Sequence, residues 1–171
     1  MRITYCLNSI SCVGGIEIVT IVKANALADI IGNEVFIVVT DCSNCENNIS
    51  LLSPKVKLID LSINYYADDW KSQWHVLKGI FIKRRLHKKR LAKTLYEIQP
   101  DVAISVGQSE KYMLSEIKGN WVTIRELHYG KDFRRLAASS RSIIYKISAK
   151  LSDIYDYCYK IGQYDQVVIL T

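Results

Sequence analysis

Short apolar runs alternate with longer amphipathic stretches along the whole chain. Such alternation is typical of a parallel β-sheet covered by helices, because each crossover between parallel strands needs a dozen or more residues. The runs that we expect to form strands are 2–7, 34–39, 56–61, 101–106, 121–125 and 166–170. The pattern therefore predicts an α/β domain.

Three of the amphipathic stretches are long enough to form helices that cover such a sheet. Residues 15–31 carry apolar side chains at helical spacing, and Gly32 follows where a helix stop is expected. Residues 70–98 have a mainly helical pattern and run into Pro100, which disfavours helical geometry in the residue before it. The clearest periodicity comes late, at Leu136, Ile143, Ile147, Leu151, Ile154, Cys158 and Ile161. We expect this late stripe to face the sheet.

Length and composition indicate one folded domain over residues 1–171. The 171 residues can bury one core, and a content of 49% hydrophobic and 23% charged residues is typical of a globular protein. The first residues, MRITYCLNSISCVGG, fit neither a signal peptide nor a membrane span, so we expect a cytoplasmic protein. The chain stops directly after the apolar run 166–170, so we expect that further protein originally followed it.

The cysteines give little indication of a metal site. Their number, five, is odd, and we expect reduced thiols in a chain of this size. Cys42 and Cys45 form an isolated CxxC, without a second cysteine pair or paired histidines to complete a tetrahedral site. A polar loop after a strand is the favoured interpretation over redox or metal chemistry, and we expect no bound metal.

Two glycines stand where a helix start could receive an anion. In open α/β sheets ligands bind beyond the carboxyl ends of the strands, and the loops NSISCVGG and GQSEKY follow the first and fourth predicted strands. Gly14 and Gly15 would open the first helix, where free backbone N–H groups favour a phosphate. The alternative is a tight strand-to-helix turn. Neither GxGxxG nor GxxxxGK[ST] occurs, which disfavours an NAD oxidoreductase or a nucleoside triphosphatase.

Titratable residues gather in the loop after the fifth predicted strand. His128 could transfer a proton or bind a hydroxyl, and Glu126 could accept hydrogen bonds from sugar hydroxyls. Arg125 could offer a planar fork to a phosphate or carboxylate. The alternative is a helix-entry loop in which the glutamate and arginine pair with each other.

A strongly basic segment extends from Lys78 to Lys93. It holds eight lysine and arginine residues, no acidic residue and several interleaved apolar residues, against a net charge of +6 for the whole chain. A basic amphipathic helix is attracted to an anionic membrane surface. A solvated helix face is the alternative; nucleic acid is a weaker one, because no helix-turn-helix, zinc-finger or RNA-binding signature is present.

Several motifs together resemble the N-terminal domain of family 4-type glycosyltransferases of the GT-B fold. They are, in order, VGGIE, ANALADIIGNEV, QPDVAISVG, WVTIRELHYG and YKISAKLSDIYDYCYKIGQYDQVVILT. In the second motif Asn33 stands where the family usually has histidine. The resemblance spans nearly the whole chain and implies a Rossmann-like doubly wound parallel sheet with helices on both faces.

The resemblance also implies an activity and assigns residues to it. It implies retaining, metal-independent transfer of a sugar from a nucleotide diphosphate sugar to a glycan or lipid-linked acceptor, without a cofactor, as in surface polysaccharide biosynthesis at the inner membrane face. Gly14, Gly15 and Arg125 would lie near the donor, whereas Glu126 and His128 would line the cleft as catalytic residues.

The same resemblance implies a missing partner domain. The family's C-terminal donor-binding domain, with its two glutamates separated by seven residues, has no counterpart here, so we expect this chain alone to be inactive. The competing hypothesis is a non-catalytic Rossmann-like binding or interaction domain that uses the same crevice or the basic face.

Overall fold

A computed structural model describes residues 1–11, 14–42, 49–65, 73–107, 109–128 and 143–170. Within these residues six strands form one sheet in the order β3-β2-β1-β4-β5-β6, and every neighbouring pair is parallel. The strands are β1 (Arg2–Leu7), β2 (Glu34–Val39), β3 (Val56–Asp60), β4 (Val102–Ser105), β5 (Val122–Leu127) and β6 (Gln166–Ile169). All six predicted strands are therefore confirmed, with boundaries that differ by at most two residues.

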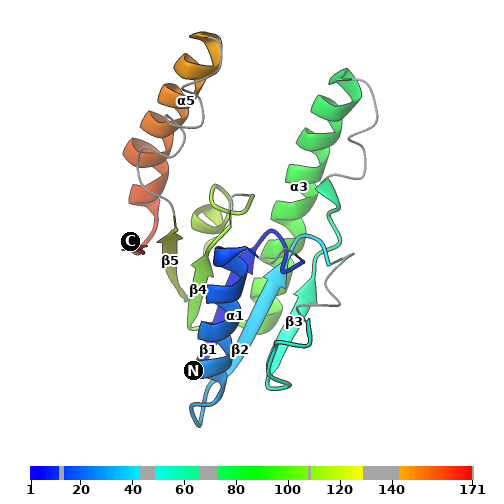
Figure 1. The fold of residues 1–171 in the computed structure, drawn as a ribbon, viewed down its shortest axis with the longest axis vertical. Coiled ribbons are helices and arrows are strands. Elements are labelled where there is room, and N and C mark those ends of the chain that lie inside the picture. Colours follow the sequence, from blue (N-terminus) through cyan, green and yellow to red (C-terminus); the bar gives the residue numbers. More distant parts are fainter. Residues whose placement is uncertain (12–13, 43–48, 66–72, 108, 129–142, 171) are drawn as a thin grey trace.

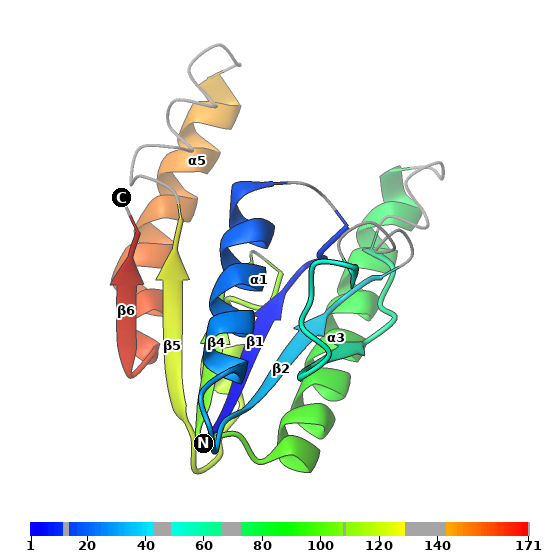
Figure 2. The ribbon, with the colours of Figure 1, turned by 60° about the horizontal axis from the view of Figure 1, so that its bottom comes forward.

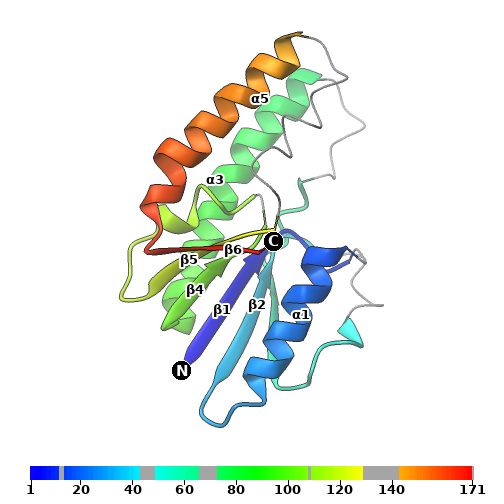
Figure 3. The ribbon, with the colours of Figure 1, turned by 60° about the vertical axis from the view of Figure 1, so that its left-hand side comes forward.

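Helices cover both faces of the sheet (Figure 1, Figure 3). Helix α1 (Gly15–Ala28) lies on one face, whereas α3 (Gln73–Ile98) and α5 (Ile143–Tyr155) lie on the other. A π-helical segment, η3 (Asp156–Lys160), and a 3-10 turn, η4 (Ile161–Gln163), continue α5, and a second 3-10 turn, η2 (Leu114–Glu116), follows β4. The arrangement is the predicted α/β, Rossmann-like doubly wound fold.

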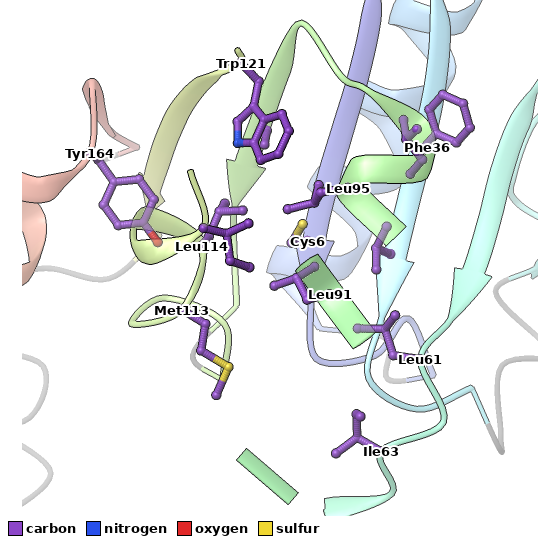
Figure 4. Close-up of a cluster of buried hydrophobic side chains, with 14 residues drawn as sticks. Cys6, Phe36, Leu61, Ile63, Leu91, Leu95, Met113, Leu114, Trp121 and Tyr164 are labelled. Carbon is purple, nitrogen blue, oxygen red and sulfur yellow. The ribbon is translucent and has the colours of Figure 1, made fainter. Parts of the chain in front are cut away.

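Two apolar layers hold the helices against the sheet. The layer under α1 contains alternate residues of the central strands, including Tyr5, Ile37 and Ile104. The layer under α3 contains the residues between them, including Cys6, and closes on Leu91 and Leu95 of α3 and on Trp121 (Figure 4). This alternation arises because successive side chains of a strand point to opposite faces. Both central faces are buried, which explains the near-continuous apolar runs in the sequence.

The late apolar stripe does not face the sheet, and this prediction is wrong. Ile143, Ile147, Leu151 and Ile154 are all exposed, as is Cys158 in η3, while Leu136 lies outside the described residues. The amino-terminal half of α5 projects beyond the edge of the sheet, so no sheet surface lies beneath it (Figure 1, Figure 3). The described contacts that fix this helix to the domain lie at its carboxyl-terminal end, at Tyr155 and in η3.

The expectation of five reduced cysteines is also wrong at one position. Cys42 is disulfide-bonded, whereas Cys6 is a buried free thiol and Cys158 an exposed one. Within the described residues no three His, Cys, Asp or Glu side chains are grouped closely enough to hold a metal ion.

Candidate functional site at the carboxyl edge of the sheet

The order of the strands reverses between β1 and β4. The loops that follow the carboxyl ends of these two strands are joined by hydrogen bonds. The side-chain oxygen of Asn8 accepts hydrogen bonds from the backbone N–H of Ser109, at 3.1 Å, and from its hydroxyl. A Cβ at Gly107 would lie 2.7 Å from Asn8 Oδ1 and 2.9 Å from its backbone nitrogen, so only glycine allows this approach. Ligands of doubly wound sheets bind at this position.

A buried ionic network supports the β4 side of this edge. Glu110 is 1% exposed, and its Oε1 accepts hydrogen bonds from Ser105 Oγ at 3.1 Å and from the Gly107 N–H at 2.7 Å. Arg125 Nη1 donates to Ser105 Oγ and to the Gly107 carbonyl, both at 2.6 Å, and lies 3.9 Å from Glu110 Oε1. Burial raises the pKa of Glu110, although the Arg125 guanidinium acts in the opposite direction.

This network places Arg125 in the wall of the site. Its side chain is 4% exposed, and Nη1 is held by groups of the protein itself. The alternative interpretation of this loop, in which Arg125 and Glu126 pair with each other, is wrong. The two side chains point to opposite faces of the sheet because they are successive residues of β5. Arg125 pairs with Glu110, and Glu126 pairs with Lys23 of α1.

Glu126 and His128 form a second buried cluster, on the face that α1 covers. Glu126 Oε1 accepts a hydrogen bond from Lys23 Nζ at 2.9 Å, and His128 Nε2 lies 3.2 Å from Glu126 Oε2. The side chains of Glu126 and His128 are 7% and 8% exposed. Within the described residues no aligned hydrogen bond reaches Glu126 Oε2 or His128 Nε2. Buried polar atoms normally have a partner, so this pair is suited to receive a ligand hydroxyl.

The electrostatics favour a neutral imidazole in this cluster. Burial lowers the pKa of His128, and the Glu126 carboxylate only partly opposes this effect. Burial and then the same carboxylate raise the pKa of Tyr5, on the β1 side, to about 12. A neutral histidine next to a carboxylate can accept a proton from a bound hydroxyl or hold that hydroxyl in place.

The glycines at the start of α1 differ in what surrounds them. A Cβ at Gly14 would lie 2.2 Å from Glu17 Oε2, because the Glu17 carboxylate lies against this glycine. A Cβ at Gly15 would meet nothing within 4 Å. Gly14 provides no side-chain cap, so the first N–H groups of the helix depend on other partners. The open position at a helix start is therefore Gly15.

The predicted site residues all lie at the carboxyl edge of the sheet, but on its two different faces. The start of α1 and the carboxyl end of β5 lie at the same end of the domain (Figure 2). The ion pair between Glu126 and Lys23 fixes Glu126 against α1, so Gly14, Gly15, Glu126 and His128 share one face of the sheet. Arg125 lies on the opposite face, with Glu110.

Sequence reasoning missed three residues that build this edge. Lys23 is the only charged residue of α1 besides Glu17. A lone lysine in a mainly apolar crossover helix could have indicated a buried acidic partner. Glu110 and Asn8 lie in the loops that the sequence indicated, but their contacts depend on strand order. That order is not visible in a linear pattern.

The parallel sheet, whose strand order reverses between β1 and β4, defines a Rossmann-like α/β domain. No protein-family model and no curated protein matches the sequence. Among solved structures, the chain is similar to the apo form of the lipopolysaccharide outer core galactosyltransferase WaaB, with a TM-score of 0.53 and 15% identity. It is also similar to TcCGT1 in complex with UDP, with a TM-score of 0.51 and 13% identity.

These similarities cover most of this chain and a minor part of the others. The alignment covers 90% of this chain and 42% of WaaB, and 82% of this chain and 32% of TcCGT1. The chain therefore spans less than half the length of either protein, and the shared feature is the fold.

Proposed function

We propose that this chain is the amino-terminal, acceptor-side domain of a nucleotide-sugar-dependent glycosyltransferase of the GT-B type. The observation that carries the proposal is the buried pair Glu126 and His128, which shares a face with the open helix start at Gly15. Among the described residues, the facing atoms Glu126 Oε2 and His128 Nε2 have no aligned hydrogen bond. The fold similarity to a galactosyltransferase and to a UDP complex supports it.

In this proposal each residue has a separate task. Gly15 gives the donor diphosphate access to the positive end of α1, where a longer side chain would hold the phosphate away. His128 and Glu126 bind the acceptor or sugar hydroxyls and handle a proton there. Lys23 holds the Glu126 carboxylate, and Arg125 acts through Gly107 as a positioning residue. Most donor contacts would belong to a second domain, and the proposal assigns no metal and no cofactor.

The finer features follow the resemblance to family 4 and are part of the proposal. They are a retaining mechanism, an acceptor that is a glycan or a lipid-linked glycan, and a role in surface polysaccharide synthesis. Such an acceptor would be reached by a cytoplasmic protein held at the inner membrane face.

The basic segment supplies the electrostatic part of that attachment. The described side chains of α3 that are exposed include Arg84, Arg85, Lys88, Lys89 and Lys93. Some are held within the protein, since Lys88 Nζ lies 2.6 Å from Glu116 Oε2. No helix in the described residues is both long enough and apolar enough to cross a membrane.

The test uses the longest open reading frame that contains this chain. The purified product is incubated with a panel of nucleotide sugars and acceptors, and the released nucleotide is measured. We expect His128→Ala to reduce turnover by about a hundredfold or more. The control Glu116→Gln alters ion pairs with Lys88 and Lys160, away from Glu126 and His128, and is expected to leave turnover unchanged. Equal turnover of the wild type and His128→Ala would show that the cleft is misplaced.

A non-catalytic Rossmann-like binding domain is the second candidate. It is favoured by the partial coverage of the two similar structures, since the aligned part of this chain corresponds to 42% and 32% of them. Nucleotide or glycan binding by the complete protein, without turnover of any donor, would support this candidate and remove the transferase proposal.

A further inference from the structure

Helix α5 presents its apolar side chains outward. The exposed fractions are 74% for Ile143, 55% for Ile147, 61% for Leu151 and 47% for Ile154. At 100° per residue these four side chains fall within about 80° of the helix circumference. A stripe of this kind on a soluble domain normally faces a core or marks an interaction surface.

The base of α5 is firmly fixed, so the outward direction of the stripe is a feature of the fold. Asp156, at the junction with η3, accepts a hydrogen bond from Lys111 Nζ at 2.8 Å and another from the Tyr112 hydroxyl. Lys160 Nζ lies 2.6 Å from Glu116 Oε1. Asp156 and Lys160 are both buried. These contacts hold the helix while its amino-terminal half extends past the sheet (Figure 1).

Cations flank the stripe. Lys146 and Lys150 are exposed and lie within about 60° of Ile143 around the helix, on one side of the stripe. The first half of α3 projects from the same edge of the sheet as α5 (Figure 1, Figure 3).

The projecting part of α3 has the same mixed character. Phe81 and Ile82 are 74% and 66% exposed, and Arg85 and Lys89 are exposed beside them. Helical spacing puts these four residues on one arc of about 100°. Two projecting helices thus carry exposed apolar residues next to lysine and arginine.

The charge decides between the possible occupants of this surface. A second copy of the chain would bring another net charge of +6 and the same flanking lysines, which repel one another. An anionic bilayer offers an apolar interior for the stripe and negative headgroups for the flanking cations.

We propose that the outward stripe of α5 inserts into the surface of an anionic membrane, which the projecting end of α3 also contacts. This inference rests on the proposed function only because that proposal already places the basic segment of α3 at the membrane. The stripe of α5 adds an apolar contact to this electrostatic attraction. Insertion of the stripe would turn the carboxyl edge of the sheet, with the site, toward the membrane. A lipid-linked acceptor would then enter the site from the side on which it resides.

The test is flotation of the protein with vesicles of phosphatidylcholine alone or with phosphatidylglycerol added. The double variant Ile147→Ser with Leu151→Ser is expected to weaken binding to the anionic vesicles by about tenfold or more, because two inserting side chains are lost. The matched control, Ile30→Ser with Ile31→Ser, changes two exposed isoleucines at the opposite edge of the sheet and should bind as the wild type does. Unaltered circular dichroism would show that the variants fold.

Three results would overturn the inference. They are equal binding by the stripe variant and the wild type, no preference for anionic vesicles, or a stripe-dependent dimer in sedimentation without vesicle binding. Transfer to a water-soluble acceptor, measured with the complete protein, separates this inference from the transferase proposal. Loss of vesicle binding with transfer intact confirms the role of α5, and vesicle binding without any transfer sinks only the transferase proposal.

Discussion

The charge of His128 reflects two opposing influences at the scale of single residues. Burial lowers the pKa of His128, whereas the Glu126 carboxylate, at 3.2 Å, raises it. The net direction is downward, so the imidazole is neutral near pH 7. Lys23 holds the other oxygen of Glu126 and so fixes the carboxylate that faces the histidine.

Replacing Glu126 tests this balance. In Glu126→Gln the opposing charge is lost, so we expect the pKa of His128 to fall below its value in the wild type. Titration of the His128 ring by NMR measures the change, and Glu116→Gln serves as the control because its partners are Lys88 and Lys160. A pKa of His128 that rises in Glu126→Gln would contradict the assigned contact.

His87 provides a prediction about stability and pH. Burial, followed by the nearby Arg84, lowers the pKa of His87 to about 4. Between this value and about 6.5 the unfolded chain binds the proton and the folded protein does not, so stability is lost as the pH falls. We expect His87 to cost about 3 kcal/mol of unfolding free energy between pH 7 and pH 4.

The measurement is urea unfolding of the wild type and His87→Gln at both pH values. The variant should lose less stability on acidification, and the difference between the two proteins isolates this histidine from the others. Parallel loss in both proteins would exclude His87 as the source of the acid sensitivity.

At the scale of elements, two glycines at one edge of the sheet should respond oppositely to the same substitution. Gly15→Ala adds a Cβ in open space and a better helix former, so we expect the free energy of unfolding to rise by up to about 1 kcal/mol. Gly107→Ala forces a Cβ against Asn8, and we expect a loss of about 1–3 kcal/mol. Thermal unfolding compares them.

Transfer activity should also respond to substitution at Gly15. A Cβ at position 15 meets no atom within 4 Å, whereas a valine side chain would occupy the place proposed for the donor diphosphate. We therefore expect Gly15→Val in the complete protein to fold and to lose transfer. Full turnover by a folded Gly15→Val protein would remove the helix start from the donor site.

The elements were predictable because their signals are local, and the misassigned features depend on tertiary structure. All six strands follow from apolar runs, and α1 begins at Gly15 as expected. The stripe on α5 was found from its spacing, but periodicity does not reveal which surface covers it. The contact of Glu126 with Lys23 joins residues 103 positions apart, and only the observed strand order brings them together.

In the molecule as a whole, the described residues supply a single wall for a ligand. The paired residues Glu126 and His128 and the open Gly15 all lie at the carboxyl edge of the sheet, on the side of α1. A single wall leaves much of a bound nucleotide sugar exposed to water. Preorganised binding that excludes water needs a second wall, which the proposal assigns to a separate domain.

This division leads to a prediction about the chain on its own. We expect the 171-residue chain to catalyse no measurable transfer, because the larger share of donor contacts would come from the second domain. The same chain within the complete reading frame should restore turnover, and His128→Ala should abolish that gain. Comparing nucleotide release by the three proteins, at equal concentration and with the same donor and acceptor, makes the measurement. Turnover by the isolated chain would contradict the two-wall model, since one wall would then be sufficient for catalysis.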